Sequence, residues 1–244
     1  PRSTPLYSSA ASDVYKRQDL AIDWIDSQAQ PWFLWLAYVA PHTPFHLPPQ
    51  SLHTRSLSGT DTDINANPRN YYLAAIEAMD TEIGRLLSSL SQEKRDNTTI
   101  LFVGDNGTPR QVADRSIYAN GSKGNLTEGG LAVPMIASGA SVSRQNVRED
   151  ALISSTDFFA TITNIAGSSQ TSVEDSKSFK HLLTSNSSNH RDYLYSDFSG
   201  NNVSGWAVRN NFFKLILYSA KIIVCSSYLK FFFCTLFKYL TRFS

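Results

Sequence analysis

The sequence predicts an α/β fold: a mostly parallel sheet with helices on both faces, followed by the start of a smaller C-terminal sheet. Two short uncharged runs rich in aromatic and β-branched residues, 32–39 and 98–103, have the length and composition of strands buried on both faces. Between them, apolar residues from Leu73 to Leu90 recur with the period of an amphipathic helix. The order strand, helix, strand predicts a parallel βαβ unit with a right-handed crossover.

The charge distribution argues against two classes of partner. The 244 residues carry a net charge of +1, but residues 1–197 contain 16 basic and 21 acidic residues, whereas residues 198–244 contain six basic residues and no acidic one. The mildly acidic body gives no reason to expect nucleic acid as a partner. In the basic segment, lysines interrupt every apolar run before it reaches the roughly 18 residues of a membrane span, so we expect no span.

Markers of the cellular compartment are weak. Both cysteines, Cys225 and Cys234, lie in the basic segment, so the body needs no disulfide framework. Residues 1–18 lack the apolar core of a secretory signal. Sequons of the form Asn-x-Ser/Thr, which permit glycosylation in a secreted eukaryotic protein, occur at Asn97, Asn120, Asn125, Asn186 and Asn202. In a chain rich in Asn and Ser, several such sequons arise by chance.

The first candidate site residue is a histidine in a proline-rich loop. Residues 1–18 show no periodicity and resemble translated sequencing-adaptor text, so we expect a non-native or disordered extension there. A helix is expected to end near Ala29, and the strand at 32–39 breaks at Ala40-Pro-His-Thr-Pro44. Prolines on both sides of His42 stiffen this loop and place the imidazole at the carboxyl end of the strand, where α/β sheets bind ligands. A lone histidine is nevertheless more often incidental.

The second candidate site follows the strand at 98–103. The preceding helix is expected to start at Asn67-Pro68, with Asn as N-cap and Pro at the first helical position. The strand then ends in Asp105-Asn106-Gly107, whose carboxylate and carboxamide offer hard oxygen donors for a cation such as Ca²⁺ or Mg²⁺. An ordinary Asx-type turn is the alternative, and this stretch alone favours it. A parallel sheet, however, brings His42 and Asp105-Asn106 to one edge.

Lys123 lies in a glycine-rich loop, residues 120–130, ahead of an expected strand at 131–137. The glycine spacing and the following strand exclude a phosphate-binding P-loop. A lysine in such a loop usually faces solvent, and a functional role requires an anion to bind. Further along, we expect a helix over 154–166, a linker or irregular lobe over 168–190, and short strands of the second sheet at 193–198 and 206–216.

Four motifs together resemble the sulfatase family of the alkaline-phosphatase-like superfamily. They are Ala40–Pro44, Ala75–Gly84, Phe102–Gly107, and Gly121–Gly130 before Val133-Pro134. The similarity runs from about Asp19 to Ile216, in the family's order and at compatible spacings. It implies a sulfuric ester hydrolase that acts on a sulfated small molecule or carbohydrate.

The resemblance also implies roles for individual residues. Asp105 and Asn106 match the pair that contributes oxygens to one active-site Ca²⁺. Lys123 matches a lysine that contacts the sulfate oxygens and neutralises their charge. His42 matches a histidine that hydrogen-bonds the sulfate ester and helps to protonate the leaving oxygen. A cation, a lysine and a positioned donor are what a highly charged transition state needs.

The sequence departs from the family at the nucleophile. Sulfatases oxidise the Cys or Ser of a Cys/Ser-x-Pro-x-Arg motif to formylglycine, and no such motif occurs here; Cys225 is followed by neither Pro nor Arg. The acidic pair that completes the metal site and a segment with a further Lys and His are also absent. We therefore expect the C-terminal portion of a sulfatase catalytic domain, inactive alone and with poor Ca²⁺ affinity. The alternatives are a pseudo-sulfatase and, with less support, a phosphoesterase or phosphonate hydrolase of the same superfamily.

These observations predict a domain order. We expect an extension at 1–18, a partial catalytic α/β domain at 19–170, a partial C-terminal subdomain at 171–216, and a non-homologous tail at 217–244. The family and the sequons indicate a secreted, periplasmic or lysosomal-type compartment.

Overall fold

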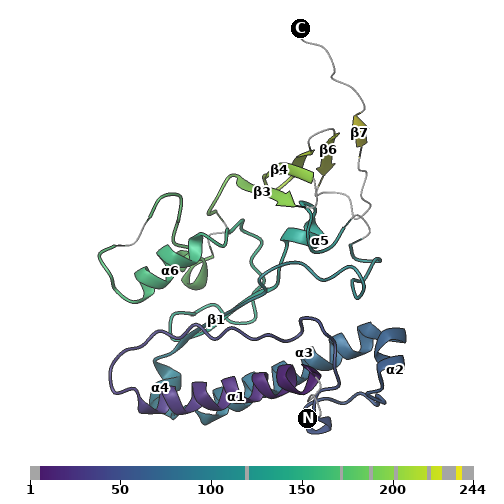
Figure 1. The fold of residues 1–244 in the computed structure, drawn as a ribbon. Coiled ribbons are helices and arrows are strands. Elements are labelled where there is room, and N and C mark those ends of the chain that lie inside the picture. The colour runs from purple at the N-terminus through teal and green to yellow at the C-terminus, as the bar shows by residue number, and fades with distance from the viewer. Residues whose placement is uncertain are drawn as a thin grey trace. The chain divides into compact units, whose positions relative to one another are not determined.

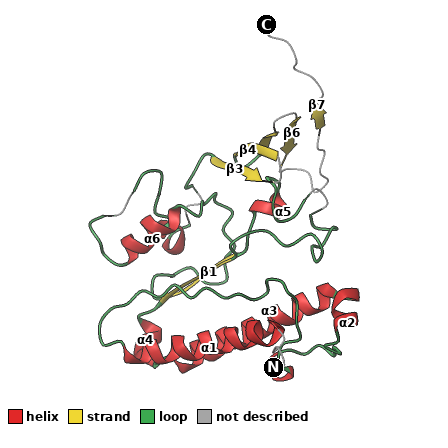
Figure 2. Cartoon of the chain, viewed as in Figure 1, coloured by secondary structure: helices red, strands yellow, loops and turns green. Residues whose placement is uncertain are grey.

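The computed structural model describes residues 6–118, 121–170, 173–186, 189–200, 203–218, 221–226 and 235–237. Contacts divide the chain into an N-terminal unit, residues 1–97 with 111–113, and a C-terminal unit, residues 98–110 with 114–244. Figure 1 draws the helices as coiled ribbons and the strands as arrows, and Figure 2 colours the loops green.

The N-terminal unit is helical. Its elements are α1 (Leu6–Ser27), η1 (Gln50–Leu52), α2 (Asp61–Ala66), α3 (Pro68–Ser89) and α4 (Gln92–Asp96). Helix α1 lies along α3 (Figure 1). Helix α3 starts with Pro68 in its first turn, as its sequence predicts. Of the expected apolar stripe, Met79 is buried but Leu73 and Ile83 are only half-buried, and the buried face also includes Tyr71 and Glu82. Tyr71 packs with Phe45 and Val112 in the core of this unit.

Two expectations for this unit are wrong. Residues 32–39 are extended but form no strand, and exposure alternates along them, with Phe33 60% and Trp35 72% exposed. An apolar run of this length fits a buried strand, but it forms one only where a neighbouring strand satisfies its backbone. The predicted parallel βαβ unit therefore lacks its first strand among the described residues.

The N-terminal extension is the second correction. Helix α1 begins at Leu6, so residues 6–18 are helical rather than irregular. Gln18, the last residue of that segment, is fully buried. Its Nε2 donates to the carbonyl oxygen of Glu82, and its Oε1 accepts from the hydroxyl of Tyr38 at 2.6 Å. That residues 1–18 are non-native stays a prediction.

The C-terminal unit combines two sheets with short helices. Its elements in chain order are β1 (Thr99–Val103), α5 (Glu128–Leu131), β2 (Met135–Gly139), α6 (Asp157–Ile165), α7 (Lys180–Thr184), β3 (Leu194–Gly200), β4 (Val203–Arg209), β5 (Phe213–Tyr218), β6 (Lys221–Ser226) and β7 (Thr235–Phe237). Strands β1 and β2 form a two-stranded sheet, and β3 to β7 follow one another in a five-stranded sheet.

The described strands pair antiparallel rather than parallel. In the first sheet, Thr99 is opposite Gly139 and Val103 is opposite Met135. The buried-strand pattern at 98–103 correctly predicts β1, but composition does not reveal the direction of a neighbour. The strand expected at 131–137 is also shifted, because residues 128–131 form α5 and β2 starts only at Met135.

The C-terminal half is more ordered than its composition indicates. The expected linker at 168–190 contains α7, and Phe179 is buried with Leu182 and Leu183 against residues of β1, β2 and α6. The predicted second sheet is present at β3, β4 and β5. Strand β5 ends at Tyr218, and β6 and β7 lie within the expected tail. Asn120 and Asn202, two of the five sequons, lie outside the described residues.

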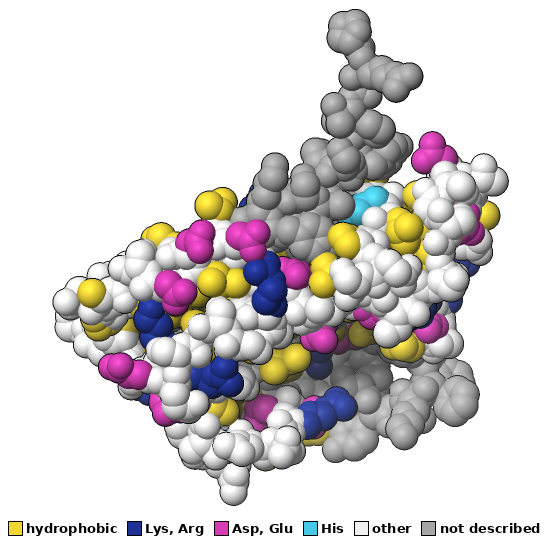
Figure 3. Space-filling model, turned by 90° about the horizontal axis from the view of Figure 1, so that it is seen from below, with side chains coloured by type: hydrophobic (Ala, Val, Ile, Leu, Met, Phe, Trp, Pro, Cys, Tyr) yellow, Lys and Arg dark blue, Asp and Glu magenta, His cyan; other side chains and the backbone are white. Residues whose placement is uncertain are grey.

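Charged side chains are interspersed on the face shown in Figure 3. Acidic (magenta) and basic (dark blue) side chains alternate there, and the described basic residues do not gather into one patch. No helix in the described part of the chain has both the length and the apolar character that crossing a bilayer requires.

Candidate functional site

The turn after β1 is held by backbone hydrogen bonds to a distant segment. The amide of Gly104 donates to the carbonyl oxygen of Pro134 at 3.0 Å, and the amide of Gly107 donates to that of Gly130 at 3.1 Å. The two chains approach so closely at Gly107 that a Cβ there would lie 1.9 Å from the carbonyl oxygen of Gly129. Only glycine fits this position, so the Asp105–Gly107 turn is fixed against the glycine-rich loop.

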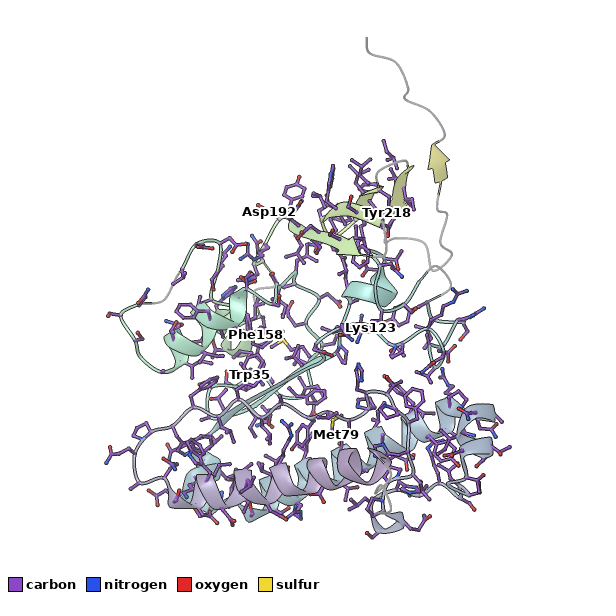
Figure 4. All side chains as sticks on the ribbon, viewed as in Figure 1. Trp35, Met79, Lys123, Phe158, Asp192 and Tyr218 are labelled. Atoms are coloured by element: carbon purple, nitrogen blue, oxygen red, sulfur yellow. The ribbon has the colours of Figure 1, made fainter. Side chains whose placement is uncertain are left out.

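Lys123 is joined to the same turn. Its amide donates to the carbonyl oxygen of Thr108 at 2.9 Å, one residue beyond Gly107. Figure 4 shows Lys123 on the loop that precedes α5. Two backbone hydrogen bonds, from Gly107 and from Lys123, therefore connect the Asp105–Gly107 turn with residues 121–130 of the loop.

The loop is compact because its own side chains close it. Asn125 donates from Nδ2 to the carbonyl oxygen of Ser122 at 2.6 Å, and its Oδ1 accepts from the amide of Thr127 at 2.8 Å. Gly121 has a φ of +151°, and a Cβ there would lie 2.4 Å from the Asn125 amide nitrogen. The side chain of Asn125 is thus occupied in holding the loop, although it belongs to a sequon.

The base of the loop contacts the five-stranded sheet. Leu126 is fully buried with Ala207 and Ile216, and its amide donates to the hydroxyl of Tyr218 at 3.2 Å. Glu128 forms ion pairs with Arg209 and Lys214 of the sheet, both at 2.9 Å. Figure 4 shows Tyr218 on the sheet next to α5.

Sequence reasoning missed Glu128 and its partners Arg209 and Lys214. The partners are 81 and 86 residues away, so no local pattern connects them. One signal was present in the sequence. Lys214 falls at a buried position of the alternating strand Phe213–Tyr218, and a lysine on the buried face of a strand requires an anionic partner.

The charged side chains at the turn and the loop are available to ligands. Asp105, Asn106 and Lys123 are exposed. Within the described part of the chain, the carboxylate of Asp105 and the ammonium of Lys123 have no hydrogen-bond or ion-pair partner, and Nδ2 of Asn106 donates to the carbonyl oxygen of Gly107 at 3.1 Å. Exposed charges are commonly only solvated. Here, however, they lie on two segments that the backbone holds together.

His42 belongs to the N-terminal unit, whereas the other three predicted site residues belong to the C-terminal unit. It is exposed, and its Nδ1 lies 2.8 Å from the carbonyl oxygen of Thr43. Backbone hydrogen bonds join the segments that carry Asp105, Asn106 and Lys123, and the convergence of these side chains with His42 in one site stays a prediction.

The donors at the turn fit a hard cation in kind but not in number. A carboxylate and a carboxamide are oxygen ligands suited to Ca²⁺. Ca²⁺ takes about six to eight ligands, and Asp105 with Asn106 supplies only part of that set. Among the described residues, no group of three or more His, Cys, Asp or Glu side chains is placed to hold a metal ion.

Comparison with known sequences gives a consistent result. The family profile described as Sulfatase matches residues 15–168. The chain is 32% identical over 151 residues to the uncharacterized sulfatase YdeN of Escherichia coli (strain K12), which covers 59% of this chain and 25% of that protein. It is 26% identical over 181 residues to arylsulfatase G of Mus musculus, covering 68% of this chain and 32% of the relative. The chain thus spans a quarter to a third of the length of these relatives.

Solved structures share the fold. Ps i-CgsB in complex with k-i-k-neocarrahexaose matches with a TM-score of 0.67 and 25% identity, covering 86% of this chain and 47% of that one. BT4656 in complex with its substrate D-glucosamine-2-N,6-O-disulfate matches with a TM-score of 0.68 and 16% identity, covering 87% of this chain and 62% of that one. These matches confirm the predicted alkaline-phosphatase-like α/β fold class.

Proposed function

We propose, because this chain belongs to the sulfatase family, that Asp105, Asn106 and Lys123 form the cation- and sulfate-facing part of a sulfuric ester hydrolase site. The substrate class is a sulfated small molecule or carbohydrate. One observation carries the proposal: the amides of Gly107 and Lys123 join the Asp105–Gly107 turn to the glycine-rich loop by two hydrogen bonds. This backbone connection supports a site in which oxygen donors for a cation and an ammonium for an anion act together.

Each residue has a role that follows from its chemistry. The ammonium of Lys123 lowers the cost of bringing a sulfate group to the site, because it offsets the negative charge on the sulfate oxygens. Asp105 and Asn106 would hold Ca²⁺, which supplies further charge stabilisation when bound. His42 would hydrogen-bond the ester oxygen and donate a proton to it as the S–O bond breaks.

The nucleophile is not assigned to a residue of this sequence. No Cys/Ser-x-Pro-x-Arg stretch occurs in the 244 residues. A chain that binds sulfated anions without hydrolysing them is therefore the second candidate function, and we expect no turnover from this chain alone. The compartment that we propose is secreted, periplasmic or lysosomal in type.

Protection of Lys123 by sulfate tests the proposal without requiring turnover. The chain is acetylated with acetic anhydride in the presence of increasing inorganic sulfate and of Ca²⁺, and each lysine is quantified by mass spectrometry. We expect sulfate to slow acetylation of Lys123, and Ca²⁺ to strengthen this protection. Lys180, whose Nζ donates to the carbonyl oxygen of Asn164 at 3.2 Å, serves as an internal control whose acetylation sulfate leaves unchanged.

Two variants sharpen the result. Asp105→Ala is expected to abolish the contribution of Ca²⁺ while sulfate alone still protects Lys123. Equal sulfate protection of Lys123 and Lys180, or none at Lys123 with Ca²⁺ present, would contradict the proposed site. In parallel, hydrolysis of an aryl sulfate with Ca²⁺ distinguishes the two candidate functions, because turnover that is lost in Lys123→Ala would show an active enzyme.

A further inference from the structure

Two cations face each other at the end of a strand pair in the five-stranded sheet. Arg209 of β4 and Lys214 of β5 are directly opposite each other in the antiparallel register. Like charges in this position destabilise a strand pair. The side chain of Lys214 is only 7% exposed, so water does little to relieve the repulsion.

A carboxylate from the glycine-rich loop bridges the two cations. Glu128 accepts from Lys214 Nζ at its Oε1 and from Arg209 Nη1 at its Oε2, both at 2.9 Å. Residues 198–244 contain no Asp or Glu, so the anion for this pair comes from outside the basic segment. Both carboxylate oxygens of Glu128 are engaged, which fixes the orientation of the side chain as well as its position.

The bridge acts on the segment that carries Lys123. Glu128 follows Lys123 by five residues, and the fully buried Leu126 lies between them against Ala207 and Ile216. The loop thus has two attachments on the sheet side, one apolar and one ionic. On the other side, two backbone hydrogen bonds hold it: the amide of Gly107 donates to Gly130 of the loop, and the amide of Lys123 donates to Thr108 after the turn.

We infer that Glu128 is a positioning residue for Lys123, and that the Arg209–Glu128–Lys214 bridge makes the five-stranded sheet part of the sulfate site. This inference rests on the proposed function, in which Lys123 contacts sulfate. The bridge holds the base of the glycine-rich loop, and the loop in turn holds Lys123 next to the Asp105–Gly107 turn. Removing the charge of Glu128 releases one attachment of the loop and restores the repulsion between Arg209 and Lys214.

Hydrogen exchange tests the bridge independently of sulfate. Exchange of the amides of Lys123 and Gly107 is measured by NMR in the wild type and in Glu128→Gln. We expect exchange at both amides to accelerate by about tenfold or more in the variant, while the β1–β2 amides change by less than about twofold. Glu149→Gln is the matched control, since it removes a carboxylate paired with Arg144 at 2.7 Å in the same unit, and it should leave Lys123 unchanged.

A second substitution separates the two effects of Glu128. Lys214→Met keeps the pair between Glu128 and Arg209 and removes the like charge, so it gives a folded protein if Glu128→Gln proves too unstable. In the double variant Glu128→Gln/Lys214→Met, no repulsion between Arg209 and Lys214 remains. We therefore expect exchange of the β4–β5 amides to return toward the wild-type rate, while exchange of the Lys123 amide stays fast. In Lys214→Met alone we expect the Lys123 amide to accelerate less than in Glu128→Gln.

Sulfate protection of Lys123 links the bridge to the site. We expect the protection of Lys123 by sulfate to weaken by about threefold or more in Glu128→Gln. Glu149→Gln, compared at a matched melting temperature, should keep the wild-type protection. Wild-type rates at the Lys123 amide in both Glu128→Gln and Lys214→Met would overturn the inference. If the wild type shows no sulfate protection, the proposed function fails, and the exchange rates still decide whether the bridge positions Lys123.

Discussion

The amide of Lys123 donates to the carbonyl oxygen of Thr108 at 2.9 Å, which ties a flexible-looking glycine-rich loop to the turn that follows β1. The contact is possible because glycines on both segments let the backbones approach. At Gly107 a Cβ would lie 1.9 Å from the carbonyl oxygen of Gly129 and 2.8 Å from the Cα of Gly130. The approach of the two segments therefore depends on the absence of a side chain at Gly107.

Gly107→Ala should disrupt this site and reduce stability. The clash is with backbone atoms, so the turn and the loop must separate and the hydrogen bond from Gly107 to Gly130 is lost. We expect a loss of about 2 kcal/mol or more in the free energy of unfolding, measured by urea denaturation. Gly84→Ala is the matched control. It lies within α3 with open space around it, and it should stabilise the protein by about 0.5–1 kcal/mol. A Gly107→Ala protein as stable as wild type would contradict the close approach.

Neutralising Asp157 is expected to lower the free energy of unfolding more than neutralising an exposed carboxylate. Its carboxylate is fully buried and accepts from Arg191 Nε at 2.9 Å, from His190 Nε2 at 3.1 Å, and from the amides of Ser154 and Lys177 at 2.9 Å each. Asp157→Asn leaves the guanidinium of Arg191 without its counter-charge. We expect a loss of about 3 kcal/mol in the free energy of unfolding by urea denaturation.

The control for Asp157 is a carboxylate of the same kind at the surface. Asp150 pairs with Arg148 at 2.9 Å, and both side chains are exposed. Asp150→Asn should change the free energy of unfolding by less than about 0.5 kcal/mol, because an exposed pair is weak. Similar losses for the two variants would argue against a buried ionic network at Asp157.

His190 should make stability fall on mild acidification. Burial lowers the pKa of its imidazole, and the nearby charges of Lys177 and His181 act in the same direction, whereas Asp157 opposes them. Nδ1 of His190 is buried without a hydrogen-bond partner in the described part of the chain, so a proton added there is not satisfied. Because the folded pKa is below the unfolded one, the unfolded state binds more protons, and stability is lost as the pH falls below about 6.5.

Replacing the imidazole tests this dependence. His190→Gln keeps a donor for Asp157 and cannot be protonated, so its stability should change less than that of the wild type between about pH 7 and pH 5. The pKa of Asp157 is also lowered: burial raises it, but hydrogen bonds from Arg191 and from the amides of Ser154 and Lys177 outweigh burial. Its contribution is lost only at lower pH, as the carboxylate protonates. Parallel pH profiles for wild type and His190→Gln would assign the effect to other groups.

Local patterns in the sequence predict the elements that local physics determines. The spacing of apolar residues identifies α3, and Pro68 marks its first turn. The run before Asp105 identifies β1, and the glycines around Lys123 identify a loop. These features need only periodicity, capping and turn chemistry, which neighbouring residues specify.

Features that depend on distant partners are not predictable in the same way. The aromatic run that contains Trp35 has the composition of a buried strand, but a strand also requires a neighbour to pair with. The antiparallel pairing of β1 with β2 depends on how residues 104–134 return, which composition does not encode. The partners of Glu128 lie more than eighty residues away in sequence, so the structure was needed to find the bridge.

Tyr38 offers a test of whether the helical segment before Asp19 is packed as the structure has it. Its hydroxyl donates to Oε1 of the buried Gln18, and burial, together with the charge of Glu82, raises its pKa to about 12. Tyr38→Phe should lower the free energy of unfolding by about 1 kcal/mol, because the buried acceptor of Gln18 loses its donor. The raised pKa predicts that the contribution of Tyr38 to the free energy of unfolding is fully present below about pH 10 and falls as the pH rises toward 12. Tyr38→Phe should remove this fall.

Tyr193→Phe, which alters an exposed tyrosine, is the control, and it should leave the free energy of unfolding and its pH dependence unchanged. Equal free energies of unfolding for Tyr38→Phe and Tyr193→Phe, measured by urea denaturation both below and above about pH 10, would show that Gln18 is not packed against Tyr38.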